Sequence, residues 1–367
     1  MKRIGIDARL AFQTGVGVYI RNFLHYLQRM SLPSDIEFFI YAMKRDADKL
    51  AIHHPQLILR EAESRWHSFD EQLTFYNTLM NDHLDLMHFT YFGYPVRYKR
   101  PFIATVHDVT PLIFKTGKAS TLNPLLYELK YHAFKYVISQ QVHHAQKIIT
   151  PTIAVKNQLI EIYGSGIEKK TDAIYEGMNY EMIDQKENSS LKKEFAEPYL
   201  LYVGNFYPHK NVDVFLDAYQ LLEKKVPLVM LGPDNYFSGE LKKRIEHEKI
   251  KGITIIHTPN TADLIFFYKH AIALVNPSLS EGFGLPLVEA AYYGCPIVAS
   301  DLPVFKELYG DSYISFDPHS VADIKEKVQS VIDTKQNVDY THVLKKFSFE
   351  KMTKEILGEY LSILHKS

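Results

Sequence analysis

The sequence predicts an α/β fold built from two domains, each with a parallel sheet. Short apolar runs of strand length alternate with longer stretches of helical periodicity along the whole chain, a pattern typical of parallel sheets covered by helices. A chain of 367 residues is long enough for two domains. A polar stretch of linker composition, residues 181–197, separates two series of such runs. We therefore predict an N-terminal domain over 1–180 and a C-terminal domain over 198–345.

Each candidate strand is a short apolar run, and each candidate helix has apolar residues recurring every three or four positions. In the N-terminal half, strands are expected at 3–6, 37–41, 86–88, 102–106 and 147–150, and helices at 18–30, 69–82 and 123–145. In the C-terminal half, strands are expected at 199–203, 228–231, 253–256, 272–275 and 297–299, and helices at 212–224, 239–249 and 349–365.

Charge and cysteine content exclude several classes of protein. The 42 Lys and Arg residues are balanced by 43 Asp and Glu, so we expect no nucleic-acid partner. The single cysteine, Cys295, excludes an internal disulfide framework. No stretch approaches the ~18 apolar residues of a membrane span, and the start lacks the apolar core of a signal peptide. We expect a cytoplasmic protein, either free or attached to the inner face of the membrane.

One region departs from this charge balance. Residues 97–147 hold eight Lys and Arg against two acidic residues, Asp108 and Glu128. Apolar residues interleave with Lys130 and Lys135 there in a partly amphipathic pattern. Such a region is either a solvated helix face or a surface that contacts anionic lipid or a lipid-diphosphate acceptor.

Residues 276–296 carry the most informative pattern of the chain. The apolar run 271–275 has strand length and ends in polar turn residues. Gly282 and Gly284 then permit a tight loop with available backbone N–H groups, and Pro286 suits the first position of a helix. A loop that leads into a helix N-terminus favours anions, because its amides and the helix dipole both attract negative charge.

Two carboxylates, Glu281 and Glu289, flank this loop. Carboxylates beside an anion site suit a ligand that carries hydroxyl groups next to phosphates, and a nucleotide-sugar fits this description. The alternative is purely structural: a buried strand, a turn and an amphipathic helix that ends at Gly294, with Glu289 complementing the helix dipole.

The segment resembles the Glu-x7-Glu signature of the retaining GT-B glycosyltransferases of family 4. Glu281 and Glu289 occupy the acidic positions, and the other matching residues are Gly282, Gly284, Pro286, Gly294 and Pro296. The resemblance implies two Rossmann-like domains facing an interdomain cleft, with a C-terminal helix in residues 346–367 that packs back on the N-terminal domain. It also implies that Glu281 contacts the donor sugar and Glu289 the ribose, while the diphosphate lies on the amides of Gly282, Phe283, Gly284 and Leu285.

A second candidate segment, residues 202–211, follows the first strand of the C-terminal domain. Ligands of open α/β sheets bind at the carboxyl ends of strands, where Lys210 can neutralise a diphosphate. The segment resembles the family's Gly-Arg/Thr…Lys-Asn motif, which implies that Lys210 contacts the leaving diphosphate. Asn205 stands in the donor site where many members carry arginine, so it offers a hydrogen bond but no charge. The positive charge then comes from Lys210, with His209 as a further candidate.

His107 and Asp108 directly follow the apolar run 102–106. The pair resembles the His-Asp motif of the family's first domain, which implies that His107 lies against the donor sugar and Asp108 on the acceptor side. Histidine can donate or accept a hydrogen bond near neutral pH and can stabilise charge at the anomeric centre. The alternative is a structural histidine, hydrogen-bonded at the end of a strand.

The segment between the first strand and the first helix contains Thr14-Gly15-Val-Gly17. Glycines permit close approach of the backbone to a ligand, and the resemblance implies that Gly15 and Gly17 lie beside the donor phosphate. Arg9 is either an acceptor contact or an exposed charge. Residues 88–95 resemble the family's acceptor-side loop, from which we select Tyr91 and Phe92. Their aromatic side chains are either ordinary core residues or, if exposed at the strand end, suited to face a sugar or a lipid.

The sequence contains no metal-binding spacing. Asp46-Ala-Asp48 is the sole Asp-x-Asp and is expected in an exposed helical stretch, and no His-x3-His or Cys-x2-Cys occurs. We therefore expect neither a metal nor a cofactor, with Lys210 and the amides of residues 282–285 neutralising the diphosphate.

These features and the resemblance predict a retaining, metal-independent glycosyltransferase that moves a hexose from a nucleotide diphosphate to a glycan or lipid-linked acceptor. The motifs look most like those of bacterial mannosyl-type enzymes of polysaccharide assembly, which favours GDP-mannose as the donor. Three alternatives stay open at this point. A GT-B nucleotide-sugar epimerase needs no acceptor, a sugar phosphorylase requires inorganic phosphate, and a non-enzymatic receptor is expected to lack the glutamate pair.

Overall fold

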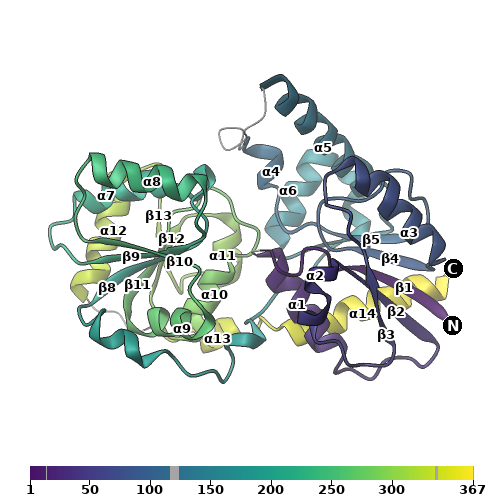
Figure 1. The fold of residues 1–367 in the computed structure, drawn as a ribbon. Coiled ribbons are helices and arrows are strands. Elements are labelled where there is room, and N and C mark those ends of the chain that lie inside the picture. Colours follow the sequence, from purple (N-terminus) through teal and green to yellow (C-terminus); the bar gives the residue numbers. More distant parts are fainter. Residues whose placement is uncertain (14, 116–123, 335–337, 367) are drawn as a thin grey trace. The chain divides into compact units, whose positions relative to one another are not determined.

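The computed structural model describes residues 1–13, 15–115, 124–334 and 338–366. The chain divides into two compact units. The first comprises Met1–Leu112, Leu122–Glu176 and Ser348–Ser367, and the second comprises Ile113–Thr121 and Gly177–Phe347. Strands alternate with helices in both units, and helices cover both faces of each sheet (Figure 1).

Seven parallel strands of the described chain form the sheet of the first unit, in the order β3-β2-β1-β4-β5-β6-β7. The chain starts at β1, runs outward to β3, returns beside β1 as β4 and then continues to the other edge. The loops after β1 and β4 therefore meet at the point where the strand order reverses, which is where such sheets bind ligands. The strands are β1 Lys2–Asp7, β2 Ile36–Ala42, β3 Leu57–Glu61, β4 Leu86–Phe89, β5 Phe102–Thr105, β6 Lys147–Thr150 and β7 Thr171–Ala173.

The helices of the first unit include the last one of the chain, α14 (Phe349–Lys366), which packs against α1 (Val16–Leu27). Its Tyr360 hydroxyl hydrogen-bonds the buried His88 of β4 at 2.6 Å. The remaining helical elements in or bordering this unit are α2 Lys44–Ala47, η1 Asp48–Leu50, η2 Glu71–Phe75, α3 Tyr76–Asn81, α4 Thr110–Ile113, α5 Pro124–His144, α6 Ile153–Tyr163 and η4 Ser165–Lys170.

The second unit repeats the same topology with the strand order β10-β9-β8-β11-β12-β13, again all parallel. Here the order reverses between β8 and β11. The strands are β8 Tyr199–Val203, β9 Leu228–Gly232, β10 Ile253–His257, β11 Ala271–Asn276, β12 Ile297–Ser300 and β13 Ile314–Phe316. The helical elements are η5 Tyr180–Met182, η6 Ser189–Lys193, η7 Pro208–Lys210, α7 Val212–Gln220, α8 Tyr236–His247, α9 Thr261–His270, α10 Leu285–Tyr292, α11 Pro303–Tyr309, α12 Val321–Thr334 and α13 Thr341–Leu344.

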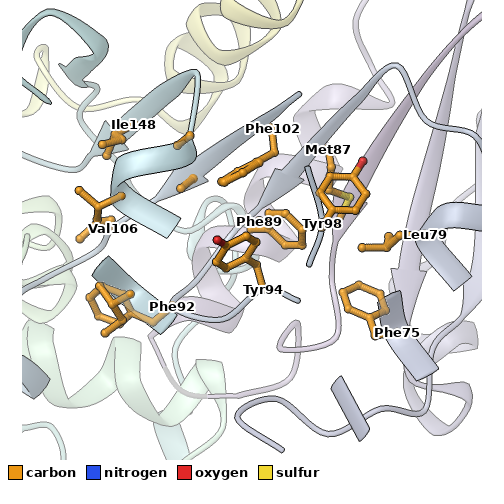
Figure 2. Packing of buried hydrophobic residues seen from close by; sticks show 14 of the residues in the cluster. Phe75, Leu79, Met87, Phe89, Phe92, Tyr94, Tyr98, Phe102, Val106 and Ile148 are labelled. Carbon is orange, nitrogen blue, oxygen red and sulfur yellow. The ribbon is translucent and has the colours of Figure 1, made fainter. Parts of the chain in front are cut away.

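Each sheet has its own hydrophobic core. In the first unit the core is rich in aromatic residues: Phe89 on β4 makes edge contacts with Tyr94, Tyr98 and Phe102, which are all fully buried (Figure 2). Burying side chains of this size supplies several kcal/mol each, which holds the strand ends and their loops in place. The core of the second unit gathers side chains from β8, β9, β11, α7 and α12.

All the predicted strands are confirmed, and the structure adds β3, β7 and β13. The predicted helix over 69–82 begins as the π-helix η2 and continues as α3. Asn123, the first residue of the predicted helix 123–145, and Thr14 lie outside the described residues. The stretch around Asp46 and Asp48 is helical and mostly exposed, as expected, but Asp46 itself is 7% exposed and pairs with Lys49 at 3.2 Å.

Residues 181–197, expected to link the two domains, group with the second unit. They contain η6, and Asn188 attaches them to α9. The Asn188 backbone N–H donates to the Ala262 carbonyl at 3.0 Å, and its side-chain amide donates to Asp263 at 2.8 Å. This segment is therefore held by specific hydrogen bonds within one unit.

Candidate functional site

In the second unit, the loops after β8 and β11 meet where the strand order reverses. The Leu279 N–H donates to the carbonyl of His209 at 2.7 Å and joins the two loops directly. These two loops carry residues that we predicted from the sequence to bind the donor. The parallel strands thus bring together segments more than sixty residues apart in the chain.

Lys210 and Glu281 form an ion pair between these loops. The Lys210 Nζ lies 2.7 Å from Glu281 Oε1, and the same oxygen accepts a hydrogen bond from the Ser278 hydroxyl at 2.8 Å. Burial alone raises the pKa of a carboxyl, but the charge and hydrogen bond of Lys210 outweigh it here, so the pKa of Glu281 lies below its usual range. Glu281 is held as a carboxylate with a fixed orientation.

The glycine loop after Glu281 leads into α10 as predicted. Gly284 has a φ of +84° in the left-handed region, and a Cβ there would come within 2.8 Å of the Phe305 ring. Glycine is therefore required both by conformation and by space. Phe283 is buried and packs edge-on against Phe347 with ring centroids 5.5 Å apart. Leu285 begins the helix, so the loop amides lie at its positive end.

Glu289 lies on α10, where its Oε2 accepts a hydrogen bond from the Tyr268 hydroxyl at 2.7 Å. Burial raises the pKa of Glu289 to about 7, although the hydrogen bond from Tyr268 acts in the opposite direction. The carboxyl is thus poised to change charge near neutral pH. Tyr268, on α9, is fully buried and was not selected from the sequence.

Asn205 lies two residues after the end of β8. Its carbonyl accepts a hydrogen bond from the Tyr202 hydroxyl, which anchors the loop to the strand. The loop continues through η7, which ends in Lys210, to Asn211 in the left-handed region with a φ of +56°. Asn211 donates its side-chain amide to the Pro318 carbonyl at 2.7 Å. Lys210 therefore sits between two fixed segments.

In the first unit, the corresponding reversal lies between β1 and β4. The Thr90 hydroxyl donates to the Asp7 carbonyl at 2.6 Å and joins the loops that follow these strands. Gly15 precedes α1 with a φ of +67°, and Gly17 lies so close to Ala11 that a Cβ would come within 2.6 Å of its carbonyl oxygen. Both glycines are thus required by the path of the loop.

Arg9 is not an exposed charge. It is 3% exposed and forms ion pairs with Asp7 at 2.6 Å and Glu71 at 2.8 Å, while its NH1 donates to the Ser64 carbonyl at 2.9 Å. Its guanidinium also lies 3.7 Å from the centroid of the Phe75 ring. Arg9 therefore ties β1 to the segment before α3, and the exposed alternative is wrong.

His107 follows β5 and is largely buried. Its Nε2 lies 2.9 Å from the Thr90 carbonyl, and its Nδ1 lies 3.2 Å from Glu176 Oε1. Glu176 was not selected from the sequence, although it is a carboxylate shortly after a strand of the same sheet. Sequence reasoning did not predict that strand, β7, so it had no signal that placed Glu176 beside the other candidates.

The acceptor-side residues divide into buried and partly exposed ones. Phe92 is 1% exposed and packs in the core, so the alternative of an exposed aromatic is wrong for this residue (Figure 2). Tyr91 is partly buried, with its ring centroid 6.4 Å from that of His107. Asp108 accepts a hydrogen bond from the Thr110 N–H at 2.7 Å and shapes the start of α4.

The described part of the chain contains neither a metal-binding cluster nor a helix suited to crossing a membrane. Within residues 1–13, 15–115, 124–334 and 338–366, no group of three His, Cys, Asp or Glu side chains is placed to hold a metal ion. No helix in those ranges combines the length and apolar character that crossing a membrane requires.

Comparison with known proteins identifies the class of enzyme that this fold and site define. The family model described as glycosyl transferases group 1 matches residues 183–347, and the model described as glycosyltransferase family 4 matches residues 13–181. Together they cover nearly the whole chain. The protein is a glycosyltransferase of the GT-B fold, and the chain belongs to these group 1 and family 4 glycosyltransferases.

Curated relatives agree with this assignment. The chain is 23% identical over 269 residues to the O-antigen chain mannosyltransferase RfbU of Salmonella typhimurium, covering 72% of this chain and 74% of the relative. It is 31% identical over 172 residues to the O-antigen chain mannosyltransferase B of Escherichia coli, covering 44% and 45%. An uncharacterized glycosyltransferase of Methanocaldococcus jannaschii is 26% identical, covering 75% and 74%. The comparisons give the epimerase alternative no support.

Solved structures share the fold at low sequence identity. A sucrose-phosphate synthase from Thermosynechococcus elongatus has a TM-score of 0.78 at 14% identity and covers both chains completely. Anabaena Alr3699/HepE, solved in complex with UDP and glucose, has a TM-score of 0.73 at 14% identity and covers 99% of this chain and all of the other. These matches establish the fold.

Proposed function

We propose that the protein transfers mannose from GDP-mannose to a glycan or lipid-linked acceptor in cell-surface polysaccharide assembly, with retention of configuration and without a metal ion. The observation that carries the proposal is the Lys210–Glu281 pair beside a glycine loop at the start of α10. A cation, a helix N-terminus and a fixed carboxylate are the groups that a sugar diphosphate needs. The two O-antigen mannosyltransferases among the relatives support mannose as the sugar.

Each group has a defined part in the proposed reaction. Lys210 and the amides of residues 282–285 stabilise the negative charge that develops on the leaving diphosphate. Glu281 accepts hydrogen bonds from sugar hydroxyls, and Glu289 accepts them from the ribose. His107 contacts the donor sugar. Because Lys210 and the amides supply positive charge themselves, the departing phosphate needs no divalent ion.

Binding and turnover measurements test this proposal. We expect GDP-mannose to raise the melting temperature, and UDP-glucose and ADP-glucose to have smaller effects, because a ligand bound to the folded state stabilises it. We further expect transfer of labelled mannose to lipid-linked glycan in the presence of EDTA, with the configuration of the product read by NMR. Stabilisation by UDP-sugars alone would contradict the donor, and a product formed without acceptor would contradict a transferase.

A matched pair of variants makes the test specific. Glu281→Ala is expected to lower turnover by at least about a hundredfold, because it removes a group that orients the reacting sugar. Glu240→Ala is the control, because Glu240 pairs with Lys243 at the same 2.7 Å distance but on an exposed helix face. Full turnover in Glu281→Ala would contradict the proposed site.

We also propose that α5 brings the enzyme to anionic membranes that carry the acceptor. The inner side of this helix packs on the core through Phe134 and Ile138. On the outer side Leu126, Leu129 and Tyr136 are each more than half exposed. Their spacing of three and seven residues places them on one helix face. Because a helix that is apolar on both sides is normally covered on both, we expect a second apolar partner, besides the core, on the outer face of α5.

Charge favours a lipid surface as this partner. Lys130, His132 and Lys135 are exposed beside the outer stripe, and basic residues near apolar ones attract anionic lipid headgroups. We expect the protein to float with phosphatidylglycerol vesicles and not with phosphatidylcholine vesicles. Leu129→Ser should reduce this binding, whereas Leu221→Ser, at a leucine of similar exposure in the second unit, should not. Equal binding by both variants would contradict the α5 surface.

A further inference from the structure

Glu176 is a buried carboxylate for which the proposed function gives no role. It lies three residues after β7 and is 4% exposed. The sheet order places β7 two strands away from β5, whose end carries His107. The segment from Ile174 to Glu176 therefore crosses the end of β6 to bring this carboxylate to the imidazole. A carboxyl group buried in this way needs a hydrogen-bond partner, and the His107 Nδ1 lies 3.2 Å from its Oε1.

The hydrogen-bond partners of His107 determine which of its ring nitrogens carries a hydrogen. The Thr90 carbonyl can only accept, so the Nε2 at 2.9 Å from it carries a hydrogen and donates. The contact between Nδ1 and the Glu176 carboxyl then requires one more proton, held between these two groups. Both ring nitrogens are engaged with fixed protein oxygens. The ring cannot rotate without breaking two hydrogen bonds.

Two aromatic side chains lie near the imidazole, which keeps 11% of its surface exposed. The Tyr19 ring on α1 meets it edge-on with centroids 4.7 Å apart, and the Tyr91 ring lies at 6.4 Å. The Tyr19 hydroxyl is itself held at 3.2 Å from the Thr105 hydroxyl. The groups that face His107 are thus Glu176 from the segment after β7, Thr90 and Tyr91 from the loop after β4, and Tyr19 from α1.

This arrangement limits what His107 can do. A general base needs a free nitrogen lone pair within reach of the substrate, and neither ring nitrogen offers one here. We propose that Glu176 is a positioning residue that holds the His107 ring, through Nδ1, in the orientation that glycosyl transfer uses. His107 then acts through its fixed place beside the reacting sugar and not as a proton shuttle. This inference rests on the proposed role of His107 in the reaction.

The competing explanation is that Glu176 merely braces the segment after β7. The two explanations differ in how the effects of variants combine. If Glu176 acts through His107, removing both side chains costs no more than removing His107 alone, because the interaction is already lost. If Glu176 is only a brace, its loss adds to the loss of His107.

The experiment measures kcat and the KM for the donor in Glu176→Ala, His107→Ala and the double variant. We expect Glu176→Ala to lower kcat by at least about tenfold with little change in KM, because a displaced group at the reacting centre costs rate more than binding. We expect the double variant to equal His107→Ala. Glu176→Gln should recover most of kcat, because its amide can donate to Nδ1. Glu187→Ala is the control, since Glu187 makes a 3.2 Å contact with His270 in the second unit.

A second readout does not depend on turnover. In protein with nitrogen-15 in its histidines, Glu176→Ala should change the ring nitrogen signals of His107, and Glu187→Ala should leave them unchanged. Unchanged His107 signals in Glu176→Ala, or additive losses of kcat, overturn the inference. Changed signals together with full activity in His107→Ala overturn the proposed role of His107 instead. If Glu176→Ala fails to fold, Glu176→Asp replaces it, because its carboxyl is one methylene too short to reach Nδ1.

Discussion

Lys210 and Glu281 hold each other in place across the loops that follow β8 and β11, with 2.7 Å between Nζ and Oε1. Both side chains are more than four-fifths buried. Removing one partner of such a pair leaves the other charge partly buried and unpaired, which costs more than the pair contributes. The pair therefore couples the stability of this edge of the sheet to the groups proposed to bind the donor.

Lys210→Met is expected to destabilise the protein in a pH-dependent way. Burial raises the pKa of Glu281, but Lys210 outweighs burial, so the folded pKa lies below the unfolded value of about 4.5. The stabilisation is therefore present above pH 4.5 and is lost as the pH falls through the folded pKa. We expect a loss of about 1–3 kcal/mol at pH 7, and a smaller difference between variant and wild type near pH 4.

Calorimetric melting of the two proteins from pH 4 to pH 7 measures this. Lys243→Met is the control, because its partner Glu240 is exposed and such pairs contribute little. A constant difference between Lys210→Met and the wild type across this range would refute the coupling.

Glu289→Gln is expected to stabilise the protein at alkaline pH. Burial raises the pKa of Glu289 from 4.5 to about 7, so the folded state keeps a proton that the unfolded state releases. Wild-type stability therefore falls as the pH rises from about 4.5 to about 7 and is level above that. The glutamine variant lacks this titration. We expect the difference in unfolding free energy between the variant and the wild type to shift in favour of the variant by about 1–3 kcal/mol from pH 5 to pH 8. Melting experiments at both pH values measure this. Parallel pH profiles of the two proteins would contradict the raised pKa.

Tyr268→Phe is expected to weaken donor binding at neutral pH. The Tyr268 hydroxyl donates to Glu289 at 2.7 Å and so favours the charged carboxylate. Without it, the pKa of Glu289 rises further, and less of the carboxylate is available to accept hydrogen bonds from the ribose. We expect calorimetric titration with GDP-mannose to show binding weaker by about threefold to tenfold at pH 7 and recovery near pH 9. Tyr236→Phe, at an exposed tyrosine of α8, is the control, and an equal loss at both pH values would exclude this mechanism.

The strands that sequence reasoning missed share one physical property. β3 and β7 are the two edges of the first sheet, and β13 is an edge of the second. An edge strand pairs on one side only and has fewer buried positions; in β3 only Leu57 is buried. Its apolar signal is weak for that reason. The central strands are apolar on both faces and were predicted from this alone.

Site residues that follow predicted strands could be predicted from the sequence. Site residues whose positions depend on side-chain contacts with distant parts of the chain could not. Lys210 and Glu281 follow predicted strands, so their meeting at one edge follows from the topology. The burial of Arg9 depends on Glu71, 62 positions away; the helix that carries Glu71 was predicted, but no local pattern indicated that it pairs with Arg9. The same holds for Glu176 at His107, which is brought there by a short edge strand.

The acid sensitivity of the first unit is expected to come from His88. This residue is fully buried, with Nδ1 2.6 Å from the Tyr360 hydroxyl of α14 and Nε2 2.7 Å from the Thr105 hydroxyl. Burial, together with a smaller effect of the charge of His107, lowers the pKa of His88 to about 3. The folded state therefore resists a proton that the unfolded state accepts below its pKa of about 6.5. Stability is fully present above pH 6.5 and falls as the pH decreases towards 3.

His88→Gln removes this titration and tests the expectation. At pH 7 the variant should be less stable, because it loses the two hydrogen bonds of the imidazole. Between pH 7 and pH 5 the wild type should lose about 2 kcal/mol that the variant keeps. Urea unfolding followed by the fluorescence of Trp66 measures this, because the single tryptophan of the chain lies in the first unit. His132→Gln, at an exposed histidine of α5, should keep the wild-type pH dependence; an unchanged dependence in His88→Gln would place the acid-sensitive group elsewhere.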